Sequence, residues 1–160
     1  YLGDCLGMQI LVIEFARNVA GMSDAHSTEM NPHTPYPVIH IMEEQKNIES
    51  RGGTMRLGGY DCELTPGTIT RNAYGINQVR ERHRHRYEVN NKLLPQLEKK
   101  GLVVAGKYKS KNLVEIVELN DHPFMVGAQF HPEFTSRPLR PNPLFQGFIE
   151  ASKTYSKKAD

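Results

Sequence analysis

The stretch Leu2-Gly3-Asp4-Cys5-Leu6-Gly7-Met8-Gln9 decides the fold of this chain. Glycines stand two residues before and two residues after the cysteine, and an apolar segment with helical spacing follows at residues 6–19. This pattern predicts a strand that ends near Tyr1-Leu2, a sharp turn, and a helix that stops at Gly21. The glycines leave room for a strained backbone, so the middle side chain is expected to project at the edge of a sheet.

Cys5 is the candidate nucleophile of this turn. A cysteine at the N-terminus of a helix lies at the positive end of the helix dipole, which favours the thiolate. A buried core cysteine beside a tight turn is the alternative interpretation of the same spacing.

The rest of the chain has the element pattern of an α/β domain. Proline-rich residues 23–37 predict an irregular loop, and glycine-rich residues 51–60 predict a mobile segment. Strands are expected at residues 38–42, 84–89, 102–108, 113–119 and 124–130, and helices at 92–100 and 143–155. Asn90 or Asn91 is the expected cap of the first of these helices, and Gly101 its stop. The last three strands follow one another closely, which indicates antiparallel pairing.

Composition excludes several classes of protein. With 160 residues, 38% of them hydrophobic and 24% charged, the chain is expected to fold as one globular unit. A net charge of +2 is too balanced to indicate nucleic acid or an anionic membrane as partner. No apolar run approaches the roughly 20 residues of a membrane span, and two cysteines do not suggest a disulfide framework. We therefore expect a cytoplasmic protein.

His131-Pro132-Glu133 follows the predicted strand 124–130. The proline stiffens the turn, so that the histidine and the carboxylate are held at a fixed offset. His131 is suited to take a thiol proton and pass it to a leaving group, while Glu133 orients the ring and stabilises the imidazolium. A structural histidine at a strand end is the alternative.

Together, the elbow at Gly3 to Gly7 and the distant His131-Pro132-Glu133 resemble the class I (triad) glutamine amidotransferases. Further segments resemble the glutaminase domain of the CTP synthases: Leu6-Gly7-Met8-Gln9, Ser27-Thr28-Glu29, the stretches 52–58 and 81–90, and Gln129-Phe130-His131-Pro132-Glu133-Phe134. The resemblance implies a flavodoxin-like α/β fold, with a mostly parallel sheet flanked by helices and a small antiparallel portion.

The same resemblance implies the roles of further residues. Cys5, His131 and Glu133 would be the catalytic set. The backbone N–H of Leu6 would donate to the oxyanion, Gln9 and Glu29 would bind the amino-acid end of glutamine, and Arg86 would pair with its carboxylate. Without the resemblance, Gln9 reads equally as an exposed helix residue and Glu29 as a solvated loop charge.

The run Arg82-His83-Arg84-His85-Arg86 alternates, so on a strand the arginines and the histidines face opposite sides. We expect no metal site there, because the cations would repel a metal ion and no ligand set of suitable spacing is completed. A solvated cationic edge is the alternative for Arg82 and Arg84. The resemblance implies GTP as an allosteric activator, with Arg56 and Leu57 as its expected contacts in the lid.

Two features depart from the family pattern. Asp4 stands before the nucleophile, where the family has an apolar residue, and a carboxylate there would disfavour the thiolate. The chain also starts at the elbow, so residues 1–160 are interpreted as the C-terminal portion of a glutaminase domain. The upstream strands, the oxyanion loop and the synthase (amidoligase) domain, which uses ATP and Mg, would lie outside it.

The function that these features imply is hydrolysis of L-glutamine to glutamate and ammonia through a cysteinyl thioester. In the full enzyme the ammonia would serve ATP-dependent amination of UTP to CTP, and the resemblance implies a homo-tetramer. No cofactor is expected in this domain itself. A regulatory nucleotide-binding module in which Asp4 has disabled Cys5, and a γ-glutamyl peptidase, are the alternatives.

Overall fold

The computed structural model describes residues 1–41 and 55–157. In this part of the chain, a six-stranded sheet has the order β1-β9-β8-β7-β4-β5, and a three-stranded sheet has the order β2-β3-β6. The large sheet contains β1 (Leu2–Asp4), β4 (Arg56–Leu64), β5 (Gln78–His85), β7 (Val103–Tyr108), β8 (Leu113–Glu118) and β9 (Val126–Ala128). The small sheet contains β2 (His26–Ser27), β3 (Pro37–Ile41) and β6 (Tyr87–Val89). The helices are α1 (Leu6–Asn18), α3 (Ile69–Tyr74), α4 (Leu94–Glu98) and α5 (Pro143–Ser156), and the short 3-10 turns are η1 (Lys109–Lys111) and η2 (Pro132–Phe134).

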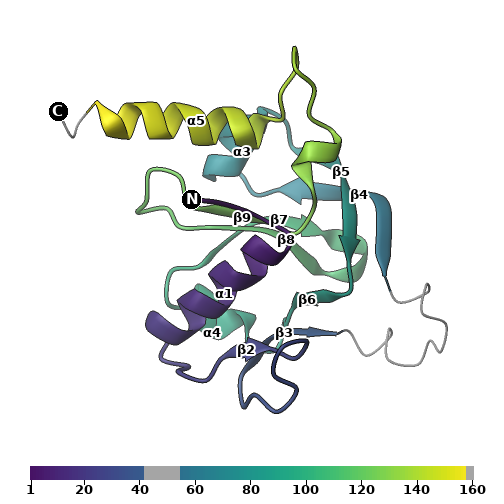
Figure 1. Ribbon diagram of the computed structural model, residues 1–160, viewed down its shortest axis with the longest axis vertical. Coiled ribbons are helices and arrows are strands. Elements are labelled where there is room, and N and C mark those ends of the chain that lie inside the picture. Colours follow the sequence, from purple (N-terminus) through teal and green to yellow (C-terminus); the bar gives the residue numbers. More distant parts are fainter. Residues whose placement is uncertain (42–54, 158–160) are drawn as a thin grey trace.

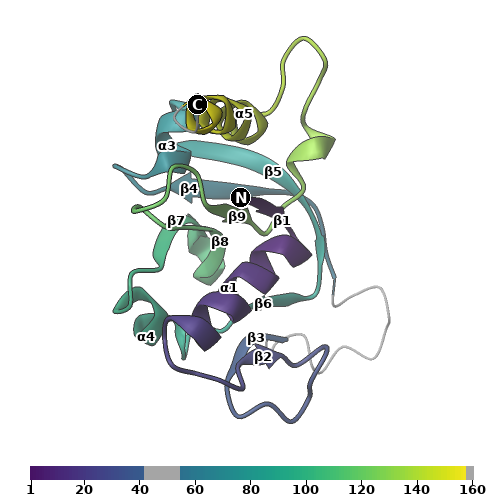
Figure 2. The ribbon, with the colours of Figure 1, turned by 60° about the vertical axis from the view of Figure 1, so that its left-hand side comes forward.

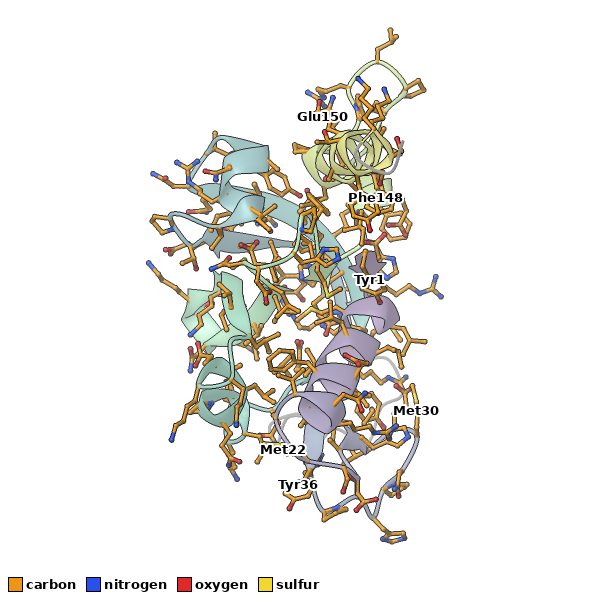
Figure 3. All side chains as sticks on the ribbon, turned by 90° about the vertical axis from the view of Figure 1, so that its left-hand side faces the viewer. Tyr1, Met22, Met30, Tyr36, Phe148 and Glu150 are labelled. Carbon is orange, nitrogen blue, oxygen red and sulfur yellow. The ribbon has the colours of Figure 1, made fainter. Side chains whose placement is uncertain are left out.

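Helices cover both sides of the large sheet (Figures 1 and 2). Helix α1 and the small sheet lie on one side, and α3 and α5 lie on the other. Two clusters of buried apolar side chains fill the corresponding spaces, one built around α1 and β3, the other around β4, β9 and α5. Figure 3 shows Phe148 on the side of α5 that faces Tyr1, and Glu150 on the opposite side of the same helix.

Antiparallel pairing predominates in the described part of the large sheet. Only β1 and β9 pair in parallel there, with Asp4 opposite Ala128, and the other four pairings are antiparallel. The α/β class with flanking helices is confirmed, but the expected mostly parallel sheet is wrong for these residues. The connections from β7 to β8 and from β8 to β9 are too short for the crossover that a parallel pair needs.

Several predicted elements are confirmed within a few residues. These are α1, the consecutive antiparallel strands β7, β8 and β9, and α5. Gly101 ends the α4 segment with a φ of 106°, a conformation that glycine adopts without strain. The arginines of β5 are exposed and its histidines buried, as the alternating sequence predicts.

Other predictions were wrong. The expected strand at 84–89 is two strands in different sheets, because β5 ends at His85 and β6 begins at Tyr87. The expected irregular loop 23–37 contains the short strand β2, which pairs with β3. Residues 56–60 of the glycine-rich stretch lie in β4, while residues 51–54 are outside the described residues. The N-cap of α4 is Leu93 rather than an asparagine, although the Asn90 side chain accepts the Lys92 N–H nearby.

Among the helices of the described residues, none combines the length and apolar character that a membrane span requires.

Candidate active site

Cys5 lies at a strained elbow between β1 and α1. Its φ is 49° and its ψ is −100°, values that a residue with a side chain rarely adopts. The Cys5 N–H donates to the Ala128 carbonyl at 2.7 Å, which extends the β1–β9 pairing into the turn. The helix begins at the next residue, so the thiol is held where the strand ends and the helix starts.

The two glycines around this elbow have unequal roles. A Cβ on Gly3 would lie 2.6 Å from the Tyr1 ring and 2.7 Å from the backbone carbon of Gly7. A Cβ on Gly7 would meet only the Tyr1 hydroxyl, at 3.4 Å. That hydroxyl donates to the Gly7 carbonyl at 2.8 Å. Close packing therefore requires glycine at position 3, and Tyr1 braces the first turn of α1.

The Cys5 thiol is half-buried. Burial raises its pKa, the hydrogen bond from the Leu6 N–H opposes that effect, and the charges of Glu133, Glu88 and Glu29 raise the pKa further. Burial and carboxylates thus outweigh the helix dipole, in contrast to the expected stabilised thiolate. The resting nucleophile is a thiol and needs a base.

His131 and Glu133 form a hydrogen-bonded pair beside this elbow. His131 Nδ1 lies 2.7 Å from Glu133 Oε1, which fixes the tautomer with the Nδ1 proton toward the carboxylate and leaves Nε2 as the basic nitrogen. The His131 N–H donates to the Arg82 carbonyl on β5 at 2.8 Å. Both Cys5 and Asp4 feel the Glu133 charge, so the three side chains share one edge of the sheet.

A pocket of ≈ 440 Å³ opens at the nucleophile. Its lining consists of Cys5, Leu6, Gln9, Glu29, Met55, Arg84, His85, Arg86 and Tyr87. It therefore brings together all the residues predicted to bind substrate, with Glu29 supplying a carboxylate and Arg86 a guanidinium. A separate, more apolar pocket of ≈ 300 Å³ near Phe124 and α5 holds none of the candidate catalytic side chains.

Gln9 is buried, so the alternative of an exposed helix residue is wrong. Its amide donates to the Tyr87 carbonyl at 3.1 Å and to the Gln129 side chain at 3.4 Å. The Gln129 amide in turn lies 3.9 Å from the Cys5 sulfur. Sequence reasoning missed Gln129 as a neighbour of the nucleophile, although it stands two residues before His131.

Arg56 and Leu57, the predicted GTP contacts, face different environments. Arg56 is 6% exposed and forms ion pairs with Glu88 at 3.1 Å and Glu115 at 2.8 Å, whereas Leu57 is 55% exposed. Their contact with GTP stays a prediction. Sequence reasoning missed the buried carboxylates that hold Arg56.

Asp4 brings a further carboxylate to the site. Its Oδ1 is buried and has no hydrogen-bond partner among the described residues. Burial, followed by the Glu133 charge, raises the pKa of Asp4 to about 6, while His131 acts in the opposite direction.

Residues 1–151 match the family model of the glutamine amidotransferase class-I domain. The chain belongs to this family. This amidotransferase is 61% identical over 151 residues to the CTP synthase of Rubrobacter xylanophilus, which covers 94% of the chain and 27% of the relative. It is 57% identical over 152 residues to the CTP synthase of Halalkalibacterium halodurans, covering 95% of the chain and 29% of the relative. The chain thus spans less than a third of the length of these relatives.

Solved structures agree with this assignment. The glutaminase domain of Trypanosoma brucei CTPS with bound acivicin superposes with a TM-score of 0.89 at 38% identity, over 96% of this amidotransferase and 60% of that chain. A putative GMP synthase protein from Thermoplasma acidophilum, 16% identical with a TM-score of 0.60 over 99% of the chain and 59% of its own, shares the fold.

Proposed function

We propose that this chain hydrolyses L-glutamine to glutamate and ammonia, with Cys5 as nucleophile. The observation that carries the proposal is the strained elbow that opens Cys5 into a pocket shared with Glu29 and Arg86. A free amino acid presents an ammonium and a carboxylate, and these two side chains supply the complementary charges.

The proposed chemistry starts from the resting thiol. His131 Nε2 takes the Cys5 proton as the sulfur attacks the side-chain amide carbon of glutamine. The oxyanion that forms lies near the Leu6 N–H, which donates to it. His131 returns the proton to the leaving nitrogen, and ammonia departs. Water then attacks the thioester, gives its proton to His131, and releases glutamate and the thiol.

Substrate binding would also activate the nucleophile. The Glu29 carboxylate is one of the charges that raise the pKa of Cys5. An ammonium placed on Glu29 cancels that charge and so favours the thiolate when substrate is present. The enzyme would therefore keep an unreactive thiol until glutamine is bound.

In the full-length protein, the ammonia is proposed to reach a synthase domain of the same polypeptide that aminates UTP to CTP with ATP and Mg. The high identity to CTP synthases supports this step. GTP activation through Arg56 and Leu57, and assembly as a homo-tetramer, belong to the same proposal.

A glutamine-mimicking diazoketone tests the proposal. Peptide mass spectrometry of the full-length protein should show modification of Cys5, protection by L-glutamine, and no modification of Cys62. Cys62 is the internal control because it is fully buried and burial raises its pKa. Equal reaction at both cysteines, or no protection by glutamine, would contradict the proposal.

Asp4 favours one alternative, a regulatory module of the same fold in which the cysteine is inactive. A buried carboxylate without a hydrogen-bond partner beside the nucleophile is the observation behind it. Nucleotide binding together with an unreactive Cys5 in the diazoketone experiment would support this alternative.

A further inference from the structure

Glu81 is a buried carboxylate behind the catalytic dyad, and it is 4% exposed. Its Oε1 accepts hydrogen bonds from the Tyr74 hydroxyl at 2.8 Å and the Asn142 amide at 2.8 Å. Its Oε2 accepts a hydrogen bond from the Thr135 hydroxyl at 2.6 Å. Burial and the Glu81 charge together raise the pKa of Tyr74, so this phenol stays a neutral donor. Three elements thus converge on one carboxylate.

The contact with Thr135 connects Glu81 to the dyad. Thr135 is the C-cap of η2, the turn that carries Glu133. At the other end of this turn, the His131 N–H donates to the carbonyl of Arg82, the residue after Glu81. Two adjacent residues of β5 therefore hold both ends of the segment 131–135.

The remaining partners of Glu81 fix the segment between the dyad and α5. Asn142 caps α5 by accepting the Leu144 N–H at 3.0 Å, and its own N–H donates to the Ser136 hydroxyl at 3.1 Å. Because the Asn142 amide also donates to Glu81, the start of α5 and the end of η2 are fastened to the same point on β5.

We propose that Glu81 is a positioning residue for the glutamine hydrolysis described above, because it holds the His131–Glu133 segment against strand β5. The inference rests on that proposed function. Glu81 touches neither the pocket nor the reacting atoms, so it acts through Thr135 and the turn. Strand β5 ends at the pocket, where Arg84 and His85 form part of the lining. One strand thus sets the dyad and part of the substrate pocket in a common frame.

A matched control separates positioning from general stability. Glu118 is also a buried carboxylate that accepts three hydrogen bonds, from the Ile69 N–H at 2.7 Å, the Thr70 N–H at 3.0 Å and the Thr70 hydroxyl at 2.9 Å. These contacts cap α3 and do not reach η2. Glu81→Gln and Glu118→Gln remove similar interactions, but only the first releases the dyad.

Steady-state kinetics of glutamine hydrolysis in the full-length protein test the inference. Glu81→Gln should lower kcat about 10- to 100-fold, because a small misplacement of the base weakens the chemical step. KM for glutamine should stay within about twofold, since Glu29 and Arg86 keep their places. Glu118→Gln should keep kcat near that of the wild type. Equal kcat for the two variants would overturn the proposal.

Thr135 provides a second variant in case Glu81→Gln fails to fold. Thr135→Val keeps the shape but removes the hydroxyl, and should lower kcat like Glu81→Gln, whereas Thr135→Ser should restore it. The double variant should lose no more than either single one, because both changes break the same contact. Additive losses would overturn the proposal.

Nuclear magnetic resonance of the His131 ring gives a readout that does not need activity. The Nδ1 proton shared with Glu133 should change its chemical shift in Glu81→Gln and not in Glu118→Gln. If the wild type does not hydrolyse glutamine, the proposed function fails, and this measurement alone decides the positioning role. An unchanged His131 signal in Glu81→Gln would overturn the inference.

Discussion

Asp4 stands next to the nucleophile with a buried carboxylate oxygen that has no hydrogen-bond partner among the described residues. Its pKa is raised to about 6, by burial first and by the Glu133 charge second. Ionising this group in the folded protein is therefore unfavourable. The strand β1 fixes its position, because Asp4 is the last residue of that strand and pairs with Ala128.

Replacing Asp4 with asparagine should stabilise the protein at neutral pH. The folded pKa lies above the ordinary value of 3.8, so the penalty is absent below pH 3.8 and complete above about pH 6. The full shift corresponds to ~3 kcal/mol. Solvent screening of this half-exposed group reduces the expected gain to about 1 kcal/mol. Denaturant unfolding of wild type and Asp4→Asn at pH 7 and near pH 4 measures it.

The control for this prediction is Asp121→Asn, at an exposed position. The stability gain of Asp4→Asn should shrink as the pH falls. A gain that is equally large at both pH values would contradict the electrostatic explanation.

At the scale of elements, a buried ionic network joins the strands of both sheets. Arg56 on β4 pairs with Glu88 on β6 and Glu115 on β8. His83 and His85 on β5 contact the same two carboxylates. Burial by itself raises the pKa of Glu115, but the hydrogen bond from His83 and the Arg56 charge outweigh it and lower the pKa. The network therefore ties the strand that lines the pocket to the centre of the sheet.

Removing the cation at the centre of this network should be strongly destabilising. Arg56→Met leaves Glu88 without its guanidinium partner and Glu115 with only His83, and breaking such a buried pair costs about 3–5 kcal/mol. Arg80→Met is the matched control, since its pair with Asp61 is 67% and 48% exposed and should contribute at most about 1 kcal/mol. Denaturant unfolding of both variants measures the difference. Similar losses for the two would show that the network adds nothing beyond a surface pair.

At the scale of the whole molecule, stability is concentrated at the centre of the large sheet. All residues of β8 are buried, and the strand is paired on both sides, with β7 and β9. In the described part of α5, by contrast, Leu144 near the start is the buried residue. The two layers of side chains on either side of the sheet meet at β8, as Figures 1 and 2 show for the covering elements.

Amide hydrogen exchange should follow this distribution. Residues 113–118 are expected to exchange only through global unfolding, while residues 150–156 exchange through local fraying with a much smaller free energy. Mass spectrometry of the corresponding peptides after timed exchange measures both. Equal protection of the two segments would contradict a core centred on β8.

The sequence alone was sufficient for features that are local in the chain. The elbow around Cys5, the pair His131 and Glu133, and the alternating faces of β5 each depend on spacings of a few residues. Backbone geometry translates such spacings directly into a turn, an offset or a face. The resemblance added the expected lining of the pocket, and the structure brings those residues together.

Tertiary structure alone decided the features whose partners are distant in the chain. Arg56 reads as a lid cation in sequence, yet its carboxylates stand 32 and 59 residues away and take it into the core. Glu81 reads as one charge in a polar run, and only folding brings Thr135 and Asn142 to it. Spacing rules reach a few residues along the chain. Burial, charge pairing and sheet order depend on which distant segments meet, and packing determines that.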